Sequence, residues 1–322
     1  MLVIVLLIFF IICILILFYR IRLQWYLAYK QNLVNLNAEQ IYHHLCCYEF
    51  PFECFYGINL AFYRTFVSPT ISKVYRQTNT IAGETEKRVN DTDILMHAWV
   101  DYGLDSDEGQ ASIEHLNNIH GVFSNRTRNE DFVYVLCCFI VDTIRMIDVF
   151  GWRQLDNTEK QALFIFYEKV GQKMNLKNLP KSLEDVYILV NDYTNSDINA
   201  TETESGSILT NAIHILVQKW YGLLLPASII RILLNGLLYV VGGEMFHKKL
   251  GLKQPSSLTL YIIYALGTLH RDFMHFMPPR IVPHRLSDLL MKQNYMCPAG
   301  KSNFLQVGPP KILASVAQKE KQ

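Results

Sequence analysis

The first eighteen residues of the chain, 1–18, contain no charged residue, no proline and no glycine. Arg20 and Arg22 follow directly after this apolar run. A helix of about 20 apolar residues, rising roughly 1.5 Å per residue, crosses the hydrocarbon core of a bilayer. We therefore expect residues 1–22 to form a transmembrane anchor, so that the rest of the chain folds beside membrane lipid.

A cleaved signal peptide is the alternative interpretation of this segment. Signal peptides carry positive charge before the apolar run and small residues after it. Here the charge follows the run, and Tyr19, Trp25 and Tyr26 stand where small residues would be. Because basic flanking residues are retained on the cytoplasmic side, we expect a single-pass anchor with a cytoplasmic body.

The composition excludes several classes of function. The 322 residues carry a net charge of +1 and no basic stripe, so no nucleic-acid partner is expected. The seven cysteines form no Cys-x-x-Cys pattern, and we expect Cys137 and Cys138 to be inert buried thiols rather than axial ligands. The sequence contains none of the glycine-rich motifs that are typical of hydrolases, nucleotidases and dehydrogenases. The 50% hydrophobic content instead favours a thick helical core, an apolar ligand cavity or a surface that rests on the membrane.

Helical periodicity continues along the rest of the chain, whereas the alternation typical of strands is scarce. We expect an all-α fold with a juxtamembrane helix at 23–45, one helical domain at 46–290 and a C-terminal tail at 291–322. The apolar run 226–243 holds Arg231 and Asn235 near its middle, which favours a buried or membrane-resting helix over a second span. The expected helices of the domain are 58–66, 70–77, 84–102, 107–123, 129–150, 158–174, 183–193, 208–221 and 226–249.

His120 is the candidate metal ligand. In a helix over 107–123, Ile113, Leu116 and His120 recur at three- and four-residue spacing, so His120 lies on the apolar stripe, and His115 lies off it. A histidine that points into a core either finds hydrogen-bond partners for its ring nitrogens or binds a metal. Both possibilities stay open at this point.

The preceding helix carries a mixed face. Arg88, Thr92, Leu95 and Trp99 follow at steps of four, three and four residues, and half-polar faces of this kind line ligand pockets. Asp91 stands three residues after Arg88 and can form an ion pair with it. The alternative to a ligand pocket is that this face carries only an ordinary salt bridge on the helix surface.

Several segments together carry a family resemblance. They are Glu49-Phe50-Pro51-Phe52, Tyr63 to Lys73, Lys87-Arg88-Val89-Asn90-Asp91-Thr92, Leu116-Asn117-Asn118-Ile119-His120, Asn129-Glu130-Asp131, Trp152-Arg153-Gln154-Leu155 and Gly171 to Leu176. In this order and spacing the chain resembles the ER-bound oxygenase mpaB and rubber oxygenase (latex-clearing protein) family. The resemblance is good over 49–193 and weaker beyond.

The resemblance implies a globin-like helical oxygenase that binds haem b and cleaves or oxygenates a lipophilic, isoprenoid-like substrate with O₂ at the endoplasmic reticulum membrane. His120 would be the axial ligand of the haem iron. Arg88 and Thr92 would be polar residues of the haem pocket and, with Asp91, the catalytic residues. Asp91 departs from the lysine of rubber oxygenases, so a non-haem site stays open. A haem or lipid carrier without turnover and a purely structural membrane protein are the alternatives to an enzyme.

Overall fold

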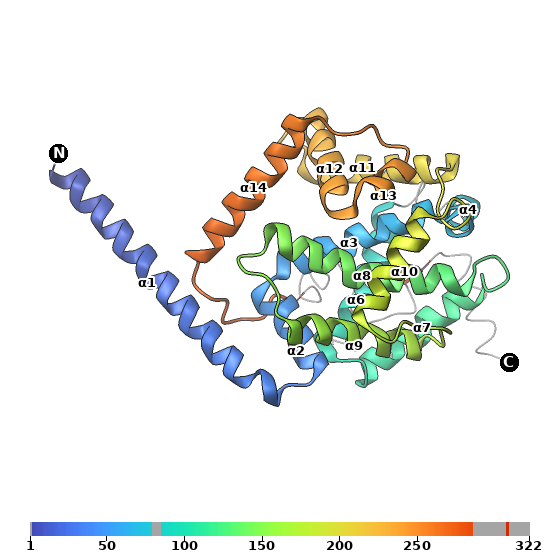
Figure 1. Cartoon of the computed structure of the whole chain (residues 1–322), viewed down its shortest axis with the longest axis horizontal. Coiled ribbons are helices and arrows are strands. Elements are labelled where there is room, and N and C mark those ends of the chain that lie inside the picture. Colours follow the sequence, from blue (N-terminus) through green and yellow to red (C-terminus); the bar gives the residue numbers. More distant parts are fainter. Residues whose placement is uncertain (1, 79–84, 286–306, 309–322) are drawn as a thin grey trace.

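The computed structural model describes residues 2–78, 85–285 and 307–308. All regular secondary structure in these residues is helical, which confirms the predicted all-α class. One long helix projects from a body made of the others (Figure 1). The helices are α1 (Leu2–Asn32), α2 (Ala38–His44), α3 (Pro51–Val67), α4 (Pro69–Thr78), α6 (Thr85–Tyr102), α7 (Asp107–Gly121), α8 (Asn129–Phe150), α9 (Asn157–Lys173), α10 (Leu183–Asn195), α11 (Glu204–Tyr221), α12 (Ala227–Gly242), α13 (Glu244–Lys249) and α14 (Ser257–His275), with short 3₁₀ and π turns at Leu33–Asn35 and Leu45–Glu49.

Helix α1 is continuous from the apolar run into the basic segment. Within the described residues, Leu2–Asn35 is the one helical stretch long and apolar enough to cross a membrane. The expected juxtamembrane helix 23–45 is divided, because α1 ends at Asn32 and α2 begins at Ala38. A capping box causes this restart: the Asn37 side chain accepts the Gln40 N–H at 2.9 Å, and Gln40 Oε1 accepts the Asn37 N–H at 3.0 Å.

Helix α8 lies at the centre of the body and has the predicted bounds, 129–150. It packs most extensively against α3 (Figure 1). Between these helices, Arg64 donates two hydrogen bonds to Asp142, at 2.9 and 2.7 Å, and both side chains are fully buried. Arg64 also donates to the Gly242 carbonyl at 2.9 Å. This buried ion pair therefore joins α3, α8 and the end of α12.

Two helices, α12 and α13, replace the single helix predicted over 226–249. Gly243 adopts φ +91°, a left-handed conformation that favours glycine, and it separates α12 from α13. Helix α12 packs against α11 and α14, and Asn235 bonds to His247 at 2.6 Å. Helix α14 was not predicted as an element. The predicted tail 291–322 lies outside the described residues, apart from Val307 and Gly308.

Candidate active site

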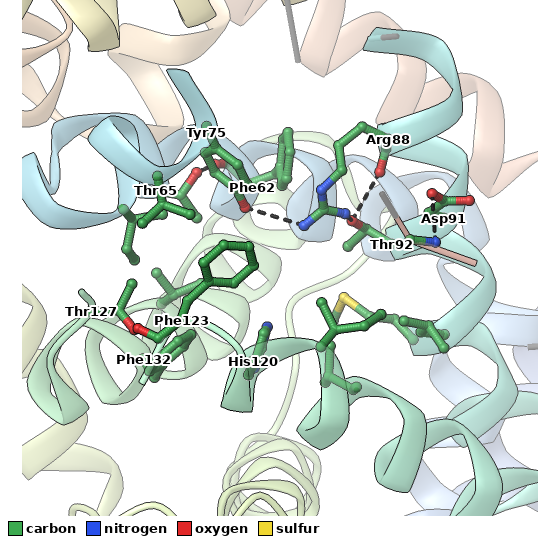
Figure 2. A pocket seen from close by; sticks show the side chains of 18 of the residues that line it. Phe62, Thr65, Tyr75, Arg88, Asp91, Thr92, His120, Phe123, Thr127 and Phe132 are labelled. Carbon is green, nitrogen blue, oxygen red and sulfur yellow. Dashed lines mark hydrogen bonds between the residues drawn. The ribbon is translucent and has the colours of Figure 1, made fainter. Parts of the chain in front are cut away.

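A largely apolar cavity of about 150 Å³ lies between α3, α4, α6, α7 and α8. Its walls include all four residues of the mixed face predicted on α6, together with His120 of α7 (Figure 2). Aromatic and aliphatic side chains supply most of the remaining wall. The main ones are Phe62, Ile71, Val74, Leu116, Phe123, Phe132, Leu136 and Phe139.

Helices α6 and α7 are held together beneath this cavity by a chain of hydrogen bonds. Trp99 donates its indole N–H to Ser112 Oγ at 3.0 Å, and Ser112 donates to the Leu95 carbonyl at 2.9 Å. The Ser106 side chain caps α7 by accepting the Gly109 N–H at 2.9 Å. These contacts fix the helix that carries His120 against the helix that carries Arg88.

Arg88 and Thr92 form a polar group on one wall of the cavity. Arg88 donates to Thr92 Oγ1 and to the Tyr75 hydroxyl, the latter at 3.3 Å, and Thr92 donates back to the Arg88 carbonyl at 3.2 Å. The guanidinium carbon lies 5.4 and 5.7 Å from the ring centroids of Tyr75 and Phe62. The aromatic rings and Tyr75 hydroxyl therefore restrain the position of the Arg88 cation at the cavity.

His120 faces this polar group from the other side of the cavity (Figure 2). Its ring lies 4.7 Å from the Phe132 ring and makes no hydrogen bond to any described residue. Burial, and secondarily the positive charge of Arg88, lower the pKa of His120 to about 4. The imidazole is therefore neutral at physiological pH and retains a lone pair that can bind a metal.

Asp91 lines the cavity, but its basic partner differs from the one considered. Instead of Arg88, Lys87, one turn earlier at four-residue spacing, donates to Asp91 at 2.7 Å. The carboxylate also accepts the Gly308 N–H at 2.9 Å. Burial raises the pKa of Asp91 above its usual value, against the opposing effect of Lys87. Asp91 thus lies at the cavity edge and holds a C-terminal residue there.

Residues far along the sequence complete the cavity wall. Val307 and Gly308 line the cavity, and the Val307 carbonyl accepts a hydrogen bond from His115 Nε2 at 2.7 Å. Lys87 also donates to the Gly308 carbonyl at 3.1 Å. His115, which lies off the predicted apolar stripe, is therefore a buried hydrogen-bonded residue rather than an exposed one. No local sequence pattern signalled these contacts.

Helix α4 contributes a cavity wall that the sequence analysis did not predict, although the sequence contains a pattern that indicates it. Ile71, Val74, Tyr75 and Thr78 recur at helical spacing, and all four line the cavity. This stripe places the Tyr75 hydroxyl beside Arg88. A search for stripes that combine apolar and polar residues would have found it.

The side chains at the cavity offer one candidate protein ligand for a metal. Within the described residues, no group of three or more His, Cys, Asp or Glu side chains is arranged to hold an ion. Cys137 and Cys138 do not line the cavity, and burial raises the pKa of both thiols, to about 12 for Cys137. His120 is the ligand candidate that faces the cavity, which fits a cofactor that brings its own remaining ligands.

Comparisons with known proteins show the family of the chain. The sequence profile of the family described as "ER-bound oxygenase mpaB/B'/Rubber oxygenase, catalytic domain" matches residues 54–276. The chain is similar to proteins named "ER-bound oxygenase mpaB" in Penicillium brevicompactum, at 26% identity over 166 residues, and in Penicillium roqueforti, at 27% over 166 residues. These matches cover 49% of this chain and 42% and 56% of the two relatives, about half the length of each.

Proposed function

Because the chain belongs to the family of ER-bound mpaB oxygenases and rubber oxygenases through their catalytic domain, we propose that it is a membrane-anchored, haem b-dependent oxygenase. The proposed substrates are O₂ and a lipophilic, isoprenoid-like alkene. The observation that carries the proposal is the neutral imidazole of His120, which has no hydrogen-bond partner in the described chain and faces Arg88 and Thr92 across an apolar cavity.

Each wall of the cavity has a distinct part in this proposal. His120 would hold haem b through its ring nitrogen, and the haem iron, when bound, supplies the binding and activation of O₂. Arg88, Thr92 and Tyr75 offer N–H and O–H donors on the opposite wall, which can orient a bound oxygen atom or an anionic group of the cofactor. The apolar side chains exclude water and can hold a hydrocarbon chain in place.

Asp91 has a positioning part in the same proposal. Its carboxylate is engaged by Lys87 and by the Gly308 backbone, so it anchors the C-terminal wall of the cavity. We assign the contacts with the reacting groups to Arg88 and Thr92, whose donors belong to the wall that faces His120.

The anchor gives the proposed reaction its location. We propose that α1 crosses the endoplasmic reticulum membrane once, with the catalytic body on the cytoplasmic side, as the basic residues Arg20 and Arg22 favour. A lipophilic alkene concentrates in the same membrane, so the anchored body meets it at high local concentration.

An absorption spectrum of the purified full-length chain tests the cofactor. We expect a Soret band and about one haem per chain by pyridine haemochrome in the native protein, and loss of both in His120→Ala. His43→Gln is the matched control, because His43 bonds to the Val100 carbonyl outside the cavity. A His120→Ala variant that is folded and keeps its full haem content would contradict the assignment.

Oxygen uptake tests the activity separately from binding. We expect the haem-loaded chain to consume O₂ when given an isoprenoid alkene and to release carbonyl or oxygenated products. Retention of haem and alkene without O₂ uptake would instead identify a carrier built on the same scaffold.

A further inference from the structure

The outer face of α14 is a large apolar surface that the body does not cover. Thr259, Ile263 and Gly267 form the buried stripe of this helix. A Cβ at Gly267 would lie 2.9 Å from the Val149 carbonyl oxygen, so this stripe approaches α8 closely. The exposed apolar side chains on the remaining surface include Leu258 (66% exposed), Tyr261 (72%), Tyr264 (55%), Leu269 (65%) and Phe273 (59%).

The exposed surface of α14 carries one charged residue, Asp272, next to Phe273 near the end of the helix. Helix α14 contains one arginine and one aspartate, Arg271 and Asp272, close to its end. Arg271 points to the body, where it donates to the carbonyls of Asp148 and Val149 at 3.0 Å each. An exposed apolar surface of this extent on a helix indicates a partner that excludes water.

The end of α14 is attached to α1 where the apolar run of α1 ends. The Tyr19 ring lies 6.4 and 6.3 Å from the rings of His275 and Phe276, and Arg22 donates to the Met277 carbonyl at 3.2 Å. From this contact α1 leaves the body, whereas α14 follows the edge of the body in a different direction (Figure 1). A membrane crossed by α1 would therefore meet the body on the side of α14.

We propose that the exposed face of α14 rests in the interfacial layer of the membrane that α1 enters. Burial of large apolar side chains in lipid is favourable relative to water, and interfacial helices commonly use such faces. Tyr261 and Tyr264 suit the polar–apolar boundary of a bilayer. The surface is continuous with the helix already expected to lie in lipid, which favours lipid over a second copy of the chain as its occupant.

This inference depends on α1 entering a membrane and does not depend on haem or on oxygenase activity. Its consequence is that the body has two attachments, α1 and α14, and sits against the membrane in a fixed orientation. The cavity would then have a constant distance from the lipid surface.

Photo-crosslinking in lipid nanodiscs tests the contact without unfolding the protein. The full-length chain is prepared with p-benzoylphenylalanine replacing Leu269 on α14, Ile8 on α1 or Ile188 on α10, one site at a time. Ile188 is 52% exposed and serves as the matched control on another surface of the body. Adducts with the phosphatidylcholine of the nanodisc are measured by mass spectrometry after illumination.

We expect lipid adducts at Leu269 in a yield close to that at Ile8 and several-fold above that at Ile188. Adducts at Ile8 with none at Leu269 would overturn the α14 contact and leave the anchor in place. Cross-linked dimers at Leu269 in place of lipid adducts would overturn it in favour of a second copy of the chain. Equal lipid yields at Leu269 and Ile188 would also overturn it, and none of these outcomes bears on the proposed oxygenase function.

Discussion

The neutral state of His120 follows from its surroundings at the scale of single residues. The ring lies among apolar side chains, and the nearby guanidinium of Arg88 further disfavours an imidazolium. A cationic histidine cannot bind a metal through the nitrogen that holds the added proton. The same residues that enclose the cavity therefore keep His120 ready to act as a ligand.

Three histidines with lowered pKa values predict acid sensitivity of the fold: His214 and His247 are buried, and His120 is half-buried at the cavity. Burial lowers the pKa of His120, His214 and His247 to about 4 in the folded state, against roughly 6.5 in an unfolded chain. Between these values the unfolded chain binds more protons, so stability falls as the pH drops from 6.5 toward 4. At pH 5 each of these histidines lowers the free energy of unfolding by up to about 2 kcal/mol. We expect a falling midpoint of thermal unfolding over pH 7 to 5, measured by intrinsic fluorescence in detergent.

The contribution of one histidine to this slope can be isolated. His214→Gln should flatten the dependence of unfolding on pH, because its buried Nε2 has no hydrogen-bond partner in the described structure and the variant cannot be protonated. His43→Gln is the control. Equal pH slopes in the native chain and in His214→Gln would contradict this account.

The sequence predicted side-chain positions within one helix better than pairings between neighbours. Helical spacing correctly brought Arg88, Thr92 and Trp99 to the same wall, because the geometry of a helix depends only on local order. Helical spacing did not predict that Asp91 pairs with Lys87, because Lys87 and Arg88 both stand within one turn of the carboxylate. Lys87 and Asp91 both also bond to the backbone of Gly308, more than 200 residues away in the chain, which local sequence cannot reveal.

At the scale of elements, helix ends with local signals were predicted well and contacts between helices were not. The bounds of α8 were correct because a polar segment precedes the helix and a glycine follows its apolar run. Helix α14 was missed, and the break at Gly243 was read as a continuation of α12. The identity of each packing partner depends on shapes that only the folded chain brings together.

The close approach of α3 and α8 at Gly57 gives a test of this packing. A Cβ at Gly57 would lie 2.6 Å from the Thr143 Cα, a backbone atom that cannot move without separating the helices. We expect Gly57→Ala to lower the free energy of unfolding by about 1–3 kcal/mol, measured by urea titration. Gly121→Ala is the matched control, since nothing lies within 4 Å of its Cβ position. Equal stabilities of the two variants would show that α3 and α8 can separate at little cost.

At the scale of the whole molecule, the last third of α1 is docked onto the body. The Arg22 guanidinium carbon lies 4.4 Å from the centroid of the Trp152 ring, and the Tyr26 ring packs edge-on against the same tryptophan at 5.7 Å. Arg22 is buried, whereas Arg20, one half-turn earlier, is exposed. The anchor is therefore joined to the body by side-chain contacts as well as by the chain itself.

This docking predicts different behaviour for two neighbouring arginines. Arg22→Gln removes the cation from the Trp152 ring and weakens the bond to the Met277 carbonyl, so the segment 22–32 should open more often. We expect faster amide hydrogen exchange there in nanodiscs, measured by mass spectrometry, with unchanged exchange in α8. Arg20→Gln should leave both regions unchanged, because it makes no such contact in the described structure. If segment 22–32 exchanges at the same rate in Arg22→Gln and Arg20→Gln, the contacts of Arg22 do not hold this segment on the body. The docking of α1 would then depend on α14 or on the lipid.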